Sequence, residues 1–261
     1  MKLCLAIGSK LLGTRIPVLG LIMPSLDDDN VCENEQPEVI DGGNIVFHCT
    51  LHGDHERLSK VFDDGEDPQH ENATSTLNEK NYIGKTPIQL ACILGRVDVL
   101  KELLKRGCDI QQSNSSGYTL MHFAACWNKR ACLEVLFEAG AKIDCRTENG
   151  ESVKQLALRY NHQDCVDFMD WAAARLTLVD FIAHVRAMVT DPEKLQGVKL
   201  SKEEKNTTLG SCSEKQEWLE NTSDATLQDF MQKKFDLEKQ VELILDKVNS
   251  PAPPTGNSGK K

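Results

Sequence analysis

Three stretches of this chain repeat one pattern: GKTPIQLACILGRVDVLKELLKRGCDI at residues 84–110, GYTLMHFAACWNKRACLEVLFEAGAKI at 117–143, and GESVKQLALRYNHQDCVDFMDWA at 150–172. Their first glycines stand 33 residues apart, and no gap is needed to align them. Each copy holds two short amphipathic runs, such as Pro87 to Leu94 and Val97 to Lys105, whose apolar residues recur at helical spacing. A fixed period of this length predicts a stack of helical hairpins.

The turn between the two runs carries the same chemistry in every copy. Gly95, Asn128 and Asn161 occupy this position, and glycine and asparagine are the residues that best tolerate a positive φ. A second stop signal, Gly107 and then Gly140, follows the second run. We therefore expect an all-α fold with two tight turns in each repeat.

A divergent copy lies upstream, in FHCTLHGDHERLSKVFDDG. Its two glycines, Gly53 and Gly65, match the turn and stop glycines of the next copy, with nine extra residues before Gly84. The polar segment PQHENATST fills that gap and is expected to be a loop. We interpret Asn44 to Phe62 as an N-terminal capping repeat, which gives four units, enough to bury a continuous core.

The chain continues as helix after the last copy, because no stop glycine follows residue 172. Three helical patterns come next. The first has an apolar stripe of Leu178, Ile182, Val185 and Val189. The second begins with the capping box Ser201–Glu204 and carries Leu209, Cys212 and Leu219 on one face, with Trp218 beside it. The third has helical spacing of Leu227, Phe230, Lys234, Leu237, Val241, Ile244 and Val248.

These features resemble known families. The repeat resembles the ankyrin repeat, whose T-P-L-H-x-A signature reads TPIQLA, TLMHFA and SVKQLA here. The later segment, with ARLTLVDFIAHVRAMVTD, KLSKEEKNTTLGSCSEKQEWLE and DLEKQVE, is similar to the helical lid of the seventy-kilodalton heat-shock chaperones. Together, over nearly the whole chain, they resemble the ankyrin repeat domain-containing protein 45 family. The resemblance implies an ankyrin-repeat solenoid of about four repeats followed by a three-helix bundle like a chaperone lid.

The expected organisation follows from these patterns. Residues 1–43 form a disordered acidic N-terminal region with a basic apolar start; 44–173 are ankyrin repeats (44–83 as cap and loop, then 84–116, 117–149 and 150–173); 174–248 are the lid-like module; 249–261 are a disordered tail. No nucleotide-binding or β-rich peptide-binding domain fits before Ala174, so the chaperones' ATP-driven activity does not carry over.

Charge narrows the class of partner. The net charge is −10, and residues 24–83 hold 15 acidic residues against three basic ones. A nucleic-acid-binding protein needs a basic patch, so we expect no nucleic acid. Neither apolar stretch in residues 1–23 is long enough to span a bilayer, so we expect no membrane contact. Those residues mildly resemble a mitochondrial presequence; the alternative is a start at Met23, which would make them dispensable.

Motifs typical of cofactor sites and of enzymes do not occur in the sequence. No C-x-x-C pair exists, and the nearest approach to a metal site is His48, Cys49, His52 and His55. We therefore expect no metal and no cofactor, and cysteines that are buried thiols in a reducing compartment. No phosphate-binding loop, nucleophile elbow or zinc-protease motif occurs. His122 and Cys126 stand at helical spacing, but in ankyrin repeats the histidine of this motif hydrogen-bonds backbone, so we expect no enzyme.

A partner surface follows from the resemblance. Ankyrin stacks bind on a concave face built from hairpin tips and first helices, and the residue before each turn is exposed there. Large side chains occupy this position in three successive repeats, with His52 at the matching place in the cap. The candidate partner-binding residues are Leu94, Trp127 and Tyr160 at the turns, and Tyr82, Lys85, Tyr118, Glu148 and Glu151 at the tips. The alternative is that these side chains pack on one another or on the acidic flank.

The expected function is therefore a non-enzymatic scaffold or adaptor for a protein partner. An alternative is a chaperone-associated adaptor that acts through the lid-like helices, and a third is an enzyme regulator that occupies a groove. The family resemblance implies a cytoplasmic protein at microtubule-based structures such as cilia, centrosomes or the midbody, with a chaperone or a cytoskeleton-associated protein as partner.

Overall fold

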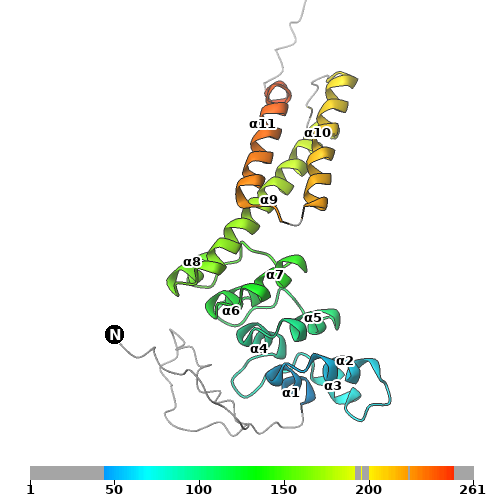
Figure 1. The fold of residues 1–261 in the computed structure, drawn as a ribbon, viewed down its shortest axis with the longest axis vertical. Helices are drawn as coiled ribbons and strands as arrows, with labels where there is room; N and C mark the ends of the chain where they lie inside the picture. Colours follow the sequence, from blue (N-terminus) through cyan, green and yellow to red (C-terminus); the bar gives the residue numbers. More distant parts are fainter. Residues whose placement is uncertain (1–43, 192–194, 196–199, 223, 250–261) are drawn as a thin grey trace, which may run out of the picture.

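The computed structural model describes residues 44–191, 195, 200–222 and 224–249. Within these ranges eleven helices follow one another and no strand is formed, which confirms the all-α class. Figure 1 shows an elongated molecule, with a stack of short helices at one end and three long helices at the other. The regions expected to be disordered, 1–43 and the tail after residue 249, lie outside the described residues.

Four helix pairs form the stack. They are α1 (Ile45–His52) with α2 (His55–Asp63), α4 (Pro87–Leu94) with α5 (Val97–Lys105), α6 (Leu120–Cys126) with α7 (Arg130–Glu138), and α8 (Val153–Arg159) with α9 (Gln163–Thr190). The first helices α1, α4, α6 and α8 pack in one row, and the second helices α2, α5, α7 and α9 pack in another. This is the expected solenoid of four repeats. We call the row of first helices, together with the hairpin tips that precede them, the inner face.

The turns behave as the sequence predicted. Gly95 has φ 74°, and Asn128 and Asn161 have φ 54° and 58°, so all three are left-handed. Gly53 of the cap has φ 75°. Gly65 stands two residues after the end of α2, as Gly107 and Gly140 stand after the ends of α5 and α7, so it keeps the expected register. Unlike those two glycines it does not adopt a positive φ, because α2 stops on an extended cap residue, Asp64.

The polar segment between the first and second repeats is not a loop. It contains α3 (His70–Thr76), which packs on α1 and α2. One small apolar residue, Ala73, is fully buried there, and the His70 ring hydrogen-bonds the Val61 carbonyl at 2.9 Å. A bidentate pair between Arg57 and Asp67 fixes the chain just before the helix.

Helix α9 is shared by two hydrophobic cores. Its first half contributes Cys165, Val166, Phe168, Met169 and Ala172 to the repeat core. Its second half packs against α10 (Lys202–Asn221) and α11 (Leu227–Asn249), and there Leu178, Ile182, Val185 and Val189 are all buried, as the stripe predicted. The boundary expected between residues 173 and 174 therefore falls inside a continuous helix.

Trp171 connects the two cores. Its ring lies 5.8 Å from that of Phe168 and 5.5 Å from that of Phe230 of α11, centroid to centroid. Its indole N–H donates to the Ala225 carbonyl at 2.8 Å. The bundle also opens with the predicted capping box, in which the Ser201 hydroxyl accepts from the Glu204 amide and the Glu204 carboxylate accepts from the Ser201 amide. No helix in the described part of the chain is long and apolar enough to cross a membrane.

Candidate functional site

The inner helices are fixed at their N-termini by one repeated device. The backbone N–H of the residue before each helix donates to the side chain three residues later: Thr86 to Gln89 at 3.1 Å, Thr119 to His122 at 3.1 Å, and Ser152 to Gln155 at 2.8 Å. Each bond satisfies a backbone donor that the helix cannot pair. The inner helices of the last three repeats therefore start from equivalent geometries.

His122 links two repeats. Because its Nδ1 accepts from the Thr119 amide, its Nε2 carries the proton and faces the Glu151 carbonyl of the next hairpin at 3.3 Å. Burial lowers the pKa of His122 to about 4, and burial raises the pKa of Cys126 to about 12. At neutral pH both groups are uncharged, so this pair is not an activated nucleophile with its base. The expected structural role of His122 is confirmed.

The residues before the turns form a row that we call the inner ladder: Leu94, Trp127 and Tyr160. Leu94 ends α4, and the other two cap α6 and α8. All three are half-buried. Trp127 packs against the repeat core, and the Tyr160 ring stacks on that of His162 at 6.1 Å. Each ladder side chain is thus partly held by the stack and partly open to solvent.

The first two hairpin tips form a mixed aromatic and cationic cluster. The Lys85 ammonium lies 4.7 Å from the centre of the Phe123 ring, and burial lowers the pKa of Lys85. The Tyr118 ring is 6.0 Å from Phe123. Tyr82 is 75% exposed and Ile83 46% exposed on the same tip as Lys85. The structure therefore groups Lys85 and Tyr118 around Phe123, which sequence reasoning did not single out.

The third tip is different, because its acidic residues serve the fold. The Glu151 carboxylate pairs with Arg159, its amide donates to the Thr147 hydroxyl, and its carbonyl faces His122. Glu148 is exposed, but its amide donates to the Ser116 carbonyl of the preceding tip at 3.0 Å. Of these two candidates, only Glu148 has a side chain left open to solvent.

Cations directly after the turns were also missed. Arg96 donates to the Leu51 carbonyl at 3.0 Å and lies against Gly53 of the preceding repeat. Lys129 lies against Gly95 in the same way. In the described part of the chain, neither side chain forms an ion pair. The signal was available in the sequence, because both residues follow a turn residue by one position.

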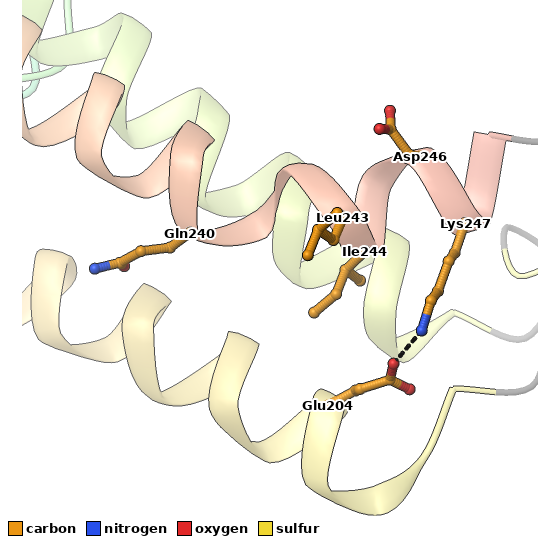
Figure 2. Close-up of a pocket in the computed structure, with 6 residues that line it drawn as sticks. All are labelled: Glu204, Gln240, Leu243, Ile244, Asp246 and Lys247. Carbon is orange, nitrogen blue, oxygen red and sulfur yellow. Dashed lines mark hydrogen bonds and ion pairs between the residues drawn. The ribbon is translucent and has the colours of Figure 1, made fainter.

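The bundle carries a second surface feature. A groove of about 500 Å³ lies between α10 and α11, lined by Glu204, Gln240, Leu243, Ile244, Asp246 and Lys247. Figure 2 shows the Glu204 carboxylate paired with the Lys247 ammonium across the groove. Leu243 is 76% exposed, so an apolar side chain stands open to solvent beside this ion pair.

The candidate metal ligands do not form a site. The His48 and His52 rings lie 4.5 Å apart on α1, whereas Cys49 is fully buried in the core. Among the residues that the structure describes, no three His, Cys, Asp or Glu side chains are grouped so as to hold a metal ion.

Comparisons with known proteins agree with this architecture. The family model "Ankyrin repeats (3 copies)" matches residues 46–147. The chain is 46% identical over 219 residues to ankyrin repeat domain-containing protein 45 of Mus musculus, which covers 84% of this chain and 88% of that protein. It is 39% identical to the Homo sapiens protein of that name over 83% of this chain and 81% of that protein. It is 35% identical to the Danio rerio protein of that name, over 64% of this chain and 59% of that protein.

Proposed function

The chain belongs to the ankyrin repeat domain-containing protein 45 family, and from that premise we propose that it is a non-enzymatic scaffold or adaptor that binds a protein partner on its inner face. Ankyrin repeats are protein–protein interaction modules, and the family model matches residues 46–147 of this chain.

One observation carries the proposal: large side chains occupy equivalent half-open positions in three successive repeats. Leu94, Trp127 and Tyr160 each precede a left-handed turn residue on the inner row. Aromatic residues that are partly held by their own protein are good anchors, because they lose little conformational freedom on binding. The exposed Tyr82 and Glu148 and the cluster of Lys85 and Tyr118 extend this surface to the tips, with Glu151 as a supporting residue.

The test is a Trp127→Ala variant. Loss of a buried aromatic anchor typically costs at least about 2 kcal/mol of binding free energy, roughly thirtyfold in affinity. Because Trp127 also touches the repeat core, its thermal melt must be recorded beside the binding measurement. Lys101→Ala is the matched control, because this exposed residue lies on the outer helix α5.

A second candidate function is a chaperone-associated adaptor that acts through the bundle. The groove beside the exposed Leu243 favours it, since an open apolar side chain next to polar groups suits a docked helix or peptide. Leu243→Asp should abolish binding of a chaperone or client to the bundle and leave the melting temperature unchanged. Retained binding would exclude this groove.

For the place of action we propose the cytoplasm, at microtubule-based structures such as the cilium, the centrosome or the midbody, with a cytoskeleton-associated protein as one class of partner. The resemblance to the ankyrin repeat domain-containing protein 45 family supports this place of action. Imaging of the tagged full chain through the cell cycle tests it, and a diffuse signal that never meets these structures would contradict it.

A further inference from the structure

The inner face has an uneven charge. The inner helices of the first three repeats, α1, α4 and α6, contain no carboxylate in IVFHCTLH, PIQLACIL and LMHFAAC. Three cations lie beside them: Lys85 at a tip, and Arg96 and Lys129 after the turns. In the described part of the chain none of these three forms an ion pair.

Nearby acids do not neutralise this surface. Asp54, after the first turn, caps α2 by accepting from the Arg57 amide. Glu151, on the third tip, pairs with Arg159, and Glu148 is exposed on that same tip. The uncompensated charge therefore lies over the first three repeats.

Lys85 is the most informative of the three cations. Lys85 is half-buried and its ammonium lies over the Phe123 ring, and burying a cation without a counter-ion is unfavourable. The aromatic ring offsets part of this cost. A carboxylate placed beside Lys85 would offset more of it, and the exposed Tyr82 and Ile83 on the same tip offer apolar surface to a ligand. The surface thus suits an acidic segment that also contains apolar residues.

The chain supplies such a segment. Residues 24–43, PSLDDDNVCENEQPEVIDGG, contain seven acidic residues and no basic one, with Leu26, Val31, Val39 and Ile40 as apolar residues. The segment ends directly before Asn44, whose side chain caps α1, the first helix of the inner row. It therefore enters the fold at one end of the cationic surface.

Its length is sufficient to cover this surface. Twenty residues can extend to roughly 65 Å, whereas α1 and α6 are separated by two helix–helix spacings of about 10 Å each. A tethered segment also has an effective concentration of about millimolar order at its own surface, so weak contacts are enough to populate the bound state.

We propose that residues 24–43 dock on the inner face across the first three repeats, with their carboxylates at Lys85, Arg96 and Lys129, and compete there with the protein partner. This inference deepens the proposed function, because it identifies an acidic segment as the class of ligand that the surface takes.

Zero-length carbodiimide cross-linking of the full chain tests the proposal, because it joins only lysines and carboxylates that are in contact. Peptide mapping should find the acids of residues 27–41 linked to Lys85 and Lys129. The exposed Lys101 and Lys105 on α5 are internal controls. We expect links to the inner lysines to exceed links to the controls by roughly tenfold, given the local concentration of a tether.

The matched variant replaces the seven acids by amides: D27N, D28N, D29N, E33Q, E35Q, E38Q and D41N. It should bring the inner links to background, and a synthetic peptide of residues 24–43 added to it should restore them. Links that are spread equally over α5, or no links at all, would overturn the proposal.

The affinity for the protein partner distinguishes the docking of residues 24–43 from the proposed partner surface. If the segment competes, the seven-amide variant binds the partner more tightly than the wild-type chain, whereas an unchanged affinity would contradict the competition. Trp127→Ala tests the proposed function independently, because it should weaken the partner in both backgrounds. If cross-linking fails but Trp127→Ala still weakens partner binding, residues 24–43 are not the ligand of the inner face. The proposed partner surface would then still stand.

Discussion

The turn residue in the middle of each helical hairpin has a left-handed backbone conformation, and the free energy of that conformation depends on the side chain. At Gly95, φ is 74°, and an added Cβ would lie 2.8 Å from Cδ of Lys129. We predict that Gly95→Val destabilises the chain by about 1–2 kcal/mol, because a β-branched side chain opposes this backbone conformation.

Asn128→Gly is the matched change, because Asn128 has φ 54° at the same position of the next repeat. It should be nearly neutral, since glycine adopts the conformation freely. Chemical denaturation of the two variants checks the pair of predictions. Equal losses of stability would mean that the turn conformation does not govern the cost.

His122 should make stability depend on pH. Its pKa is lowered from 6.5 to about 4 by burial, so between these values the unfolded chain binds a proton that the folded chain does not. The contribution of this group to the free energy of unfolding is therefore fully present above pH 6.5. It is lost as the pH drops towards 4, and the loss is at most about 3 kcal/mol. Urea denaturation at pH 7 and pH 4.5 measures the loss.

His122→Gln is the control, because Gln89 and Gln155 occupy the same position in the neighbouring repeats and accept the same backbone bond. This variant should keep most of the stability at pH 7 and show a smaller decrease at pH 4.5. An identical decrease in both proteins would assign the pH dependence to other groups.

Among the elements, the helices predicted from the 33-residue period are the ones that the structure contains. Pro87–Leu94 and Val97–Lys105 coincide with α4 and α5, because two turn signals fix both ends of each helix. Helix α3 was missed, since it buries only Ala73 and a single apolar residue gives no periodicity. Its stability depends on contacts with α1 and α2, which a local pattern does not contain.

The residues of the candidate site were predictable only where they follow from the register of the repeats. Register alone located Leu94, Trp127 and Tyr160 at equivalent positions before the turns. The contact of Lys85 with Phe123 was not predictable, because it joins neighbouring repeats and depends on how their hairpins stack. The pairing of Glu151 with Arg159 was hidden for a related reason, since it joins a tip to the end of an inner helix.

Helix α9 couples the repeats to the bundle, mainly through Trp171. We predict that Trp171→Ala costs about 2–3 kcal/mol, because it removes the contacts with Phe168 and Phe230 and leaves the Ala225 carbonyl without its donor. Hydrogen exchange should then speed up more in α10 and α11 than in α4 and α6. Equal acceleration throughout would show that Trp171 stabilises the molecule as a whole without coupling its two parts.

At the scale of the whole molecule, the chain is a short solenoid extended by a bundle, with one helix continuous between them (Figure 1). One continuous helix thus joins the repeats that carry the inner face to the bundle that carries the groove.

The central claim is that the inner face binds the partner, and site-specific photo-cross-linking in cells tests it most directly. A photoreactive phenylalanine replaces Tyr82 or Tyr118 on the inner face, and Lys101 or Lys105 on α5 in matched controls. We predict that one protein partner is cross-linked from both inner positions and from neither control, and that Trp127→Ala reduces its yield. Cross-linking of that partner from the α5 positions, with none from Tyr82 or Tyr118, would contradict the claim.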